Sequence, residues 1–294
     1  MLAAMPKLSP RDIRRKIQGI KNTRRITNAM KVVSAAKLRR AQELLYSSRP
    51  YSDKLYELVR DLAGHVDRET HPLLQEREEK KVDIVLVTAD RGLAGAFNSN
   101  VIREAEKFSE ALSSDGKEVS FVLIGRKGFQ YFSKRGYRIV KGYDEVFRKE
   151  VHFEIAKEVS EIVRERFAGG ETDAVYLLNN EMITRASYKP VRRRFLPFEL
   201  PEEGVSDSFS VYAFEVEESE FMNHLMNLYL NYQIYRAMVE SNAAEHFARM
   251  VAMDNATKNA DDLVKQWTLI FNKARQESIT LELIDIVGAA EAMK

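Results

Sequence analysis

The sequence predicts an α/β protein: long N- and C-terminal helices form an antiparallel coiled coil, and the chain between them forms a small Rossmann-like domain with a mainly parallel sheet. Two observations predict this fold class. Residues 205–287 contain neither glycine nor proline, which is typical of one very long helix. The middle of the chain instead alternates strand-length apolar runs with helical patterns. We expect an N-terminal helix within residues 1–66, a globular domain at 80–200 and a C-terminal helix within 208–294.

The N-terminal helix is predicted from residue 10 to residue 64. Ser9 is suited to cap it, Pro10 stands where no backbone donor is needed, and Asp12 places a carboxylate in the first turn. We expect a bend or an interruption near Pro50, because proline removes a backbone donor and crowds the preceding turn. The apolar stripe steps by three and four residues in two groups: Ile13, Ile17 and Ile20, then Ile26, Met30 and Val33.

The C-terminal helix carries an apolar repeat that averages 3.5 residues. Such a period predicts left-handed supercoiling with another helix, and the N-terminal helix is the available antiparallel partner. A polar stretch interrupts the repeat, and a buried polar group of this kind can set the register of a coiled coil. The predicted seam is Phe221, Leu225, Leu228, Tyr232, Tyr235, Val239, the polar Asn242, His246 and Arg249, then Met253, Ala256, Ala260, Leu263, Trp267, Ile270, Ala274, Glu277, Leu281, Ile284 and Gly288.

The central domain is predicted from strands at 82–88, 119–125 and 173–179, with a further strand near 187–195. Helices are expected at 98–112, 127–134 and 151–167. The glycine-containing loop at 89–95 follows the first strand, where parallel sheets often bind ligands. Its spacing fits neither G-x-G-x-x-G nor G-x-x-x-x-G-K-[ST], so we interpret it as a tight turn between a strand and a helix.

Composition and charge narrow the function classes. The chain has no cysteine, which excludes disulfides and thiolate chemistry, and it has no apolar segment long enough to span a membrane. Its five histidines are scattered and form no metal-binding motif, so we expect no catalytic site, cofactor or metal. Residues 7–49 carry a local charge of +11, although the whole chain has a net charge of +2. This basic segment indicates either a solvated helix face, an acidic protein partner or a nucleic acid.

Four segments resemble one known family. KNTRRITNAMKVVSAAKLRRAQ at 21–42 is similar to the N-terminal helix of the γ subunit of F-type ATP synthases. ARMVAMDNAT at 248–257 and NKARQESITLELIDIVGAA at 272–290 resemble its C-terminal helix, and TADRGLAGAFN at 88–98 resembles its central domain. The similarity includes both ends and the middle of the chain in the family's order.

The resemblance implies a non-catalytic rotor subunit on the cytoplasmic face of a bacterial inner membrane. Its partners would be the α and β subunits of the catalytic hexamer, the ε subunit and the membrane c ring, with no nucleic acid. By position in the family's motifs, some residues would contact the α and β subunits and others would form the foot that faces the c ring. The former are Met30, Lys31, Arg275, Gln276, Thr280 and Glu282, and the latter are Tyr212 and Glu215.

Two other function classes stay open on the residues alone. A basic coiled coil could bind nucleic acid, although few aromatic side chains lie among the basic ones and no known nucleic-acid-binding module occurs. An enzyme that uses a nucleotide could be built on the central domain. Neither alternative explains why both termini match the rotor family.

Overall fold

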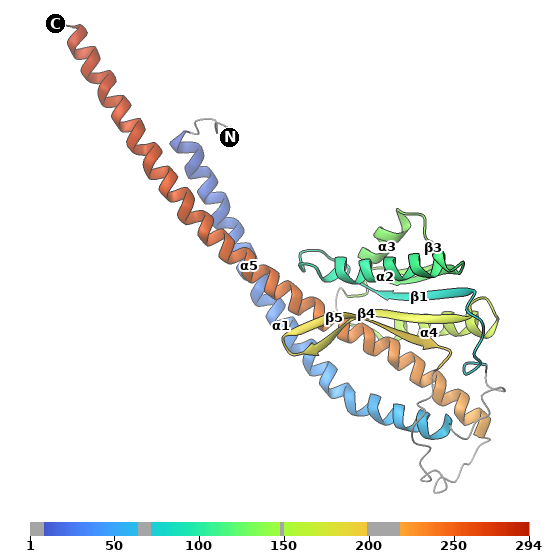
Figure 1. Cartoon of the computed structure of the whole chain (residues 1–294). Helices are drawn as coiled ribbons and strands as arrows, with labels where there is room; N and C mark the ends of the chain where they lie inside the picture. The colour runs from blue at the N-terminus through green and yellow to red at the C-terminus, as the bar shows by residue number, and fades with distance from the viewer. Residues whose placement is uncertain (1–8, 64–71, 148–149, 199–217, 294) are drawn as a thin grey trace. The chain divides into compact units, whose positions relative to one another are not determined.

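The computed structural model describes residues 9–63, 72–147, 150–198 and 218–293. Its longest elements are helix α1, Pro10–Ala63, and helix α5, Glu218–Ala292 (Figure 1). The chain divides into two compact units. We call residues 1–34 with 250–294 the terminal unit and residues 35–249 the central unit, so each long helix contributes to both.

Helix α1 begins as predicted. Ser9 accepts a hydrogen bond from the backbone N–H of Asp12 at 3.2 Å, and its hydroxyl donates to the Asp12 carboxylate at 2.7 Å, which confirms Ser9 as the N-cap. The helix does not break at Pro50; it continues through this residue to Ala63, and the portion of α1 in the central unit curves (Figure 1). Proline removes one backbone donor, and a helix that packs along its length can tolerate this loss by bending.

A five-stranded sheet forms the centre of the central unit. Its strands are β1 (Lys81–Val87), β2 (Glu118–Ile124), β3 (Arg138–Tyr143), β4 (Ala174–Thr184) and β5 (Ser187–Leu196), in the order β3-β2-β1-β4-β5. The first four strands are parallel, with Val85 opposite Val122 and Leu177. Strand β5 returns antiparallel to β4 as a hairpin. The mainly parallel sheet is therefore confirmed.

Two apolar layers cover the sheet. On one face, α2 (Phe97–Ser114) and α3 (Arg126–Ser133) pack against alternate strand residues such as Ile84 and Phe121. On the other face, α4 (Phe153–Ala168) and the central-unit portions of α1 and α5 pack against Val85 and Val122. The continuous apolar runs in β1 and β2 follow from this arrangement, because both faces of a parallel sheet are buried.

Strand β3 is the one element of the sheet that sequence patterning does not indicate. Its sequence, RIVKGY, mixes charged residues with a glycine, and most of its residues are exposed or half-buried. As an edge strand it pairs with β2 only. A strand that is covered less completely needs fewer apolar residues, so its apolar pattern in the sequence is weak.

Within the described residues, no helix is long and apolar enough to cross a membrane.

Candidate interaction surface

The seam of the terminal unit fixes which side chains α1 and α5 present to partners. On α1 the positions that face α5 are Ile13, Ile17, Ile20, Arg24, Thr27, Lys31 and Ser34, in alternating steps of four and three. All are buried or half-buried except Arg24, which reaches α5 through its ion pair with Asp261, and Met30 beside them is half-buried as well. On α5 the corresponding positions are Met253, Thr257, Ala260, Val264, Trp267, Phe271, Ala274 and Ser278, in the same steps. This is the heptad spacing of a coiled coil.

The predicted seam is correct at some positions of α5 in this unit and wrong at others. Met253, Ala260, Trp267 and Ala274 lie in the seam, whereas Leu263, Ile270, Leu281 and Ile284 are exposed. On α1, Ile26 and Val33 are also exposed, and their neighbours Thr27 and Ser34 take the seam positions. The prediction assumed that apolar side chains mark the seam, but here polar contacts occupy part of it.

Polar side chains join the two helices at the middle of the seam. Lys31 Nζ lies 2.6 Å from Asp254 Oδ1, and Arg24 lies 2.7 Å from the carboxylate of Asp261. Between these ion pairs, the hydroxyls of Thr27 and Thr257 are 2.8 Å apart. We call these six residues the polar seam.

Asp254 has a second cationic neighbour on its own helix. Lys258 Nζ lies 2.7 Å from Asp254 Oδ2, so each carboxylate oxygen accepts from one lysine. The hydrogen bonds from Lys258 and Lys31 lower the pKa of the Asp254 carboxyl to about 2. This side chain is therefore a carboxylate at neutral pH and stays ionised until the pH falls towards 2.

The outer face of α1 carries apolar and basic side chains together. Ile26, Val32 and Val33 are 61%, 61% and 56% exposed, and Lys21 and Arg25 are exposed beside them. We call these five residues the α1 outer face. Exposed aliphatic side chains grouped with exposed charge are typical of a surface that another protein covers.

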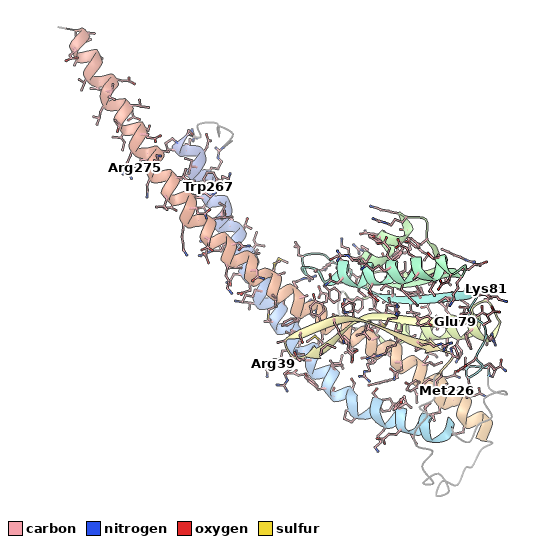
Figure 2. The ribbon with its side chains drawn as sticks, in the orientation of Figure 1. Arg39, Glu79, Lys81, Met226, Trp267 and Arg275 are labelled. Carbon is pink, nitrogen blue, oxygen red and sulfur yellow. The ribbon has the colours of Figure 1, made fainter. Side chains whose placement is uncertain are left out.

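The C-terminal part of α5 has no described partner helix. The cross-seam pairs place Pro10, the first residue of α1, opposite residues 274–275, and α5 continues past this level to Ala292 (Figure 2). Between residues 279 and 287 the branched aliphatic side chains are 44% to 65% exposed. We call them the α5 tip: Ile279, Leu281, Leu283, Ile284, Ile286 and Val287. The described residues after Arg275 include four carboxylates and no Lys or Arg.

The predicted contact residues fall into two separate groups. Arg275, Gln276, Thr280 and Glu282 are exposed on α5 next to the tip; the Thr280 hydroxyl donates to the Gln276 carbonyl, and Ser278 donates to Glu282. Met30 and Lys31 are half-buried in α1 at the level of residue 254.

Twenty-one helical residues separate 254 from 275, a rise of roughly 30 Å. The two groups therefore cannot meet one small ligand together. Lys31 also points to Asp254 in the seam rather than to the outer face of α1. Tyr212 and Glu215 lie outside the described residues.

The loop after β1 is held by its own hydrogen bonds. The carboxylate of Asp90 accepts from the backbone N–H groups of Arg126 at 3.0 Å and Phe147 at 2.8 Å. Asn98 accepts from Ala89 N–H at 2.9 Å and donates to the carbonyl of Arg91. These contacts use the polar groups that a ligand would need, which favours the interpretation of a structural turn.

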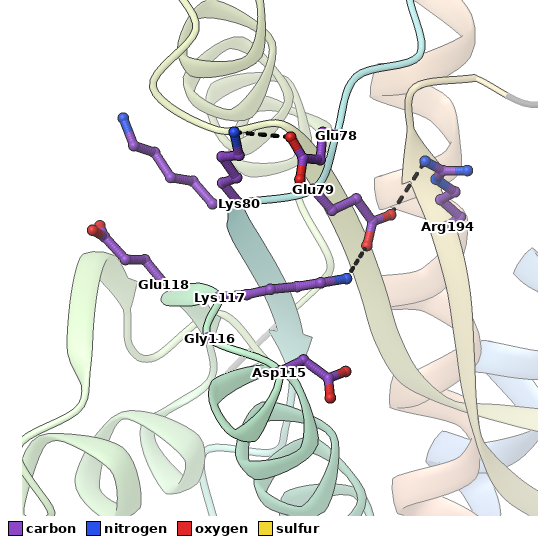
Figure 3. Close-up of a pocket in the computed structure, with 9 residues that line it drawn as sticks. Glu78, Glu79, Lys80, Asp115, Gly116, Lys117, Glu118 and Arg194 are labelled. Atoms are coloured by element: carbon purple, nitrogen blue, oxygen red, sulfur yellow. Dashed lines mark hydrogen bonds and ion pairs between the residues drawn. The ribbon is translucent and has the colours of Figure 1, made fainter.

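A charged hollow lies at the amino ends of β1 and β2 (Figure 3). Glu79 is at its centre, 2.9 Å from Lys117 and 3.2 Å from Arg194, and it accepts from the Tyr176 hydroxyl at 3.0 Å. Burial opposes the ionisation of Glu79, but the hydrogen bonds from Lys117 and Tyr176 outweigh it and lower the pKa. The hollow is lined by equal numbers of acidic and basic residues, so we interpret the cluster as internal ion pairing rather than as a binding site.

Within the described ranges, no group of acidic residues and histidines could hold a metal ion.

Comparisons with known proteins give one consistent result. The family described as "ATP synthase" matches residues 9–293. An ATP synthase gamma chain from Aquifex aeolicus is 71% identical over 290 residues, which cover 99% of each chain, and one from Sulfurihydrogenibium is 57% identical over 291 residues, 99% of this chain and all of that relative.

Solved structures agree with the fold. A chain of the Euglena gracilis mitochondrial ATP synthase F1/c-ring structure has a TM-score of 0.71 at 21% identity, covering 97% of this chain and 94% of that one. A chain of the Tetrahymena thermophila central stalk and c-ring structure has a TM-score of 0.60 at 24% identity, covering 79% and 99%.

Proposed function

This chain belongs to the ATP synthase gamma chain family, and from that premise we propose that it is the central-stalk rotor subunit of an F-type ATP synthase. In this role, ion flow through a membrane c ring turns the subunit, and its coiled coil transmits the rotation to the catalytic β subunits. The same contacts regulate ATPase activity and ion flow. The subunit contributes no catalytic site and no cofactor of its own.

The distribution of apolar side chains on the terminal unit carries the proposal. A coiled coil that worked alone would bury its aliphatic residues in the seam and leave polar ones outside. Here Ile26 and Val33 are exposed on α1, and the α5 tip exposes six aliphatic residues. Such a surface fits a shaft that other subunits enclose along its length.

The proposed partners come from the family relationship, and the charge of the α1 outer face is compatible with two of them. The basic and apolar α1 outer face suits loops of the α and β subunits that carry acidic and apolar side chains. Individual exposed ion pairs are weak, which suits contacts that must break and re-form as a rotor turns. We propose the ε subunit and the c ring as partners of the central unit, with Tyr212 and Glu215 in the foot, and the cytoplasmic face of a bacterial inner membrane as the location.

Arg275, Gln276 and Thr280 are proposed as the contacts that engage a β-subunit loop, with Glu282 beside them. All four are exposed on one helix, and Arg275 is the last cation before an acidic and apolar segment. A guanidinium can form paired hydrogen bonds with a carboxylate or with carbonyl oxygens. Met30 and Lys31 are proposed for a second contact region closer to the middle of α1.

A rotation assay tests the proposal directly. The chain contains no cysteine, so a Lys107→Cys variant offers a single attachment point on the exposed side of α2. We would assemble this variant with α and β subunits, fix the hexamer to a surface and attach a bead at residue 107. ATP should drive stepwise rotation of the bead in one direction. An intact complex that hydrolyses ATP while its beads do not rotate would refute the rotor role.

The nucleic-acid alternative is not supported by the family relationship. Two of the basic side chains, Arg24 and Lys31, also form ion pairs with α5 in the polar seam. Those two cations are therefore less available to phosphate groups than the basic sequence suggests. A gel shift with duplex DNA at physiological salt should show no specific complex.

A further inference from the structure

The polar seam raises the question of what determines which face of α1 packs against α5. Helix α1 carries two possible seams with nearly the same spacing. One is the seam in the structure, which passes through Thr27, Lys31 and Ser34, and the other would pass through the more apolar Ile26, Met30 and Val33. Apolar burial alone favours the second seam, because aliphatic side chains gain more from leaving water than threonine, lysine and serine do.

The cross-helix contacts favour the first seam. Lys31–Asp254, Arg24–Asp261 and Thr27–Thr257 all form only when this face of α1 meets α5, and they extend over one heptad of each helix. Rotating α1 by one residue, about 100°, would separate all three contacts at once. Sliding α1 by one turn would bring Lys31 towards Lys258 and away from Asp254, since 254 and 258 are one turn apart.

Stability is a poor explanation for these contacts. The four charged side chains are 27% to 47% exposed, and ion pairs at such positions contribute little net free energy of folding. Polar groups within a coiled-coil seam are known instead for fixing register and orientation, at a cost in stability. The arrangement therefore has the features of a specificity device.

We propose that the polar seam contains a register lock: its two ion pairs decide which face of α1 packs on α5 and which face is left outside. The lock keeps Ile26 and Val33 on the outer surface although they could serve as seam residues. This inference concerns the pairing of the helices within one chain, and it holds whether or not the chain is a rotor.

Disulfide trapping in the full-length chain tests the lock, since the protein has no cysteine of its own. The native pair is Thr27→Cys with Thr257→Cys, whose hydroxyls are 2.8 Å apart. The rotated pair is Ile26→Cys with Thr257→Cys, in which residue 26 points outward in the structure. Each double-cysteine variant is oxidised mildly at low protein concentration, then digested, and the yield of its disulfide is measured by mass spectrometry. The yield of the native pair divided by the yield of the rotated pair gives the ratio of native to rotated linkage.

The lock is removed by Lys31→Met, Asp254→Leu, Arg24→Met and Asp261→Leu in combination. We expect the ratio to fall by about thirtyfold, which is what two ion pairs at the upper end of surface strength supply together. The melting temperature should stay unchanged or rise, because apolar replacements extend the seam. The matched control is Asp262→Leu with Lys265→Met, which removes an ion pair of 3.3 Å that lies on one helix and does not cross the seam.

A ratio that stays within twofold of the unmodified chain would overturn the proposal, as would an equal fall in the control. If the fourfold variant does not fold, a charge exchange provides the second test. Arg24→Asp alone places two carboxylates together and should lower the ratio, whereas Arg24→Asp with Asp261→Arg should restore it. Failure of the exchange to restore the ratio would also refute the lock.

Discussion

The α5 tip allows a quantitative prediction about assembly. Ile284, Ile286 and Val287 are 60%, 65% and 59% exposed. Burying a whole side chain of this type contributes about 1.5–3 kcal/mol, so covering the exposed part contributes about 1–2 kcal/mol for each residue. Replacing all three with serine should therefore weaken binding to the subunits around the tip by about 3–5 kcal/mol, or roughly 10²- to 10⁴-fold in Kd.

The same substitutions should leave the isolated chain almost unchanged, because the three side chains are already in contact with water. The assay titrates labelled chain against hexamers of α and β subunits and compares the triple variant with Ile183→Ser. Ile183 is 50% exposed in the β4–β5 hairpin and serves as a control for the loss of an exposed isoleucine elsewhere. Equal affinity of the triple variant and the control would refute the assignment of the tip as a covered surface.

Three further predictions follow from other parts of the structure. Replacing Arg275 and Gln276 with alanine should lower ATP synthesis in reconstituted vesicles and leave the circular dichroism and melting temperature of the isolated chain unchanged; unimpaired synthesis would remove both from the mechanism. The pKa of Asp254 is lowered in the folded state, so its contribution is fully present above pH 4 and is lost as the pH falls towards 2. The melting temperatures of the wild type and Asp254→Asn should therefore converge over that interval, and a constant difference would contradict the assignment. Asp90→Ala leaves two backbone N–H groups without their acceptor and should cost about 2–5 kcal/mol in urea unfolding, whereas a loss below about 0.5 kcal/mol would show that water replaces the carboxylate.

The sequence predicts the elements that are buried on two sides. Strands β1, β2 and β4 each contain an apolar run, and their starts agree with the predicted ranges to within a residue, whereas β4 continues to Thr184, beyond the predicted end at 179. The N-cap at Ser9 can also be predicted from the sequence, because capping is a local interaction between a side chain and the first turn of the helix. Strand β3 cannot be predicted from its sequence pattern, since this edge strand takes its conformation from its pairing with β2.

The seam shows a different limit of sequence analysis. Periodicity identifies a helix with a 3.5-residue repeat, but it does not say which of two adjacent stripes faces the partner. The prediction chose Ile26 and Val33 because they are aliphatic, whereas the structure places Thr27 and Ser34 inside. Pairing of Thr27 with Thr257 depends on a residue 230 positions away, and no local pattern contains that information.

The contact residues came from family resemblance rather than from chemistry visible in the sequence. Exposure of Arg275 and Gln276 is compatible with that assignment, but exposure is common on a long helix. The exposed aliphatic group on the α5 tip could have been suspected from LELIDIV alone, because a run with so many branched residues does not suit a free helix end.

The α5 tip also has a consequence for the life of the chain before assembly. A newly made copy presents six branched aliphatic side chains to the solvent at one end of a helix. Surfaces of this kind promote self-association and are recognised by chaperones and proteases. We expect the abundance of this protein to depend on the supply of the subunits that cover its tip. Unassembled copies should be degraded, so that quality control sets the stoichiometry of the complex.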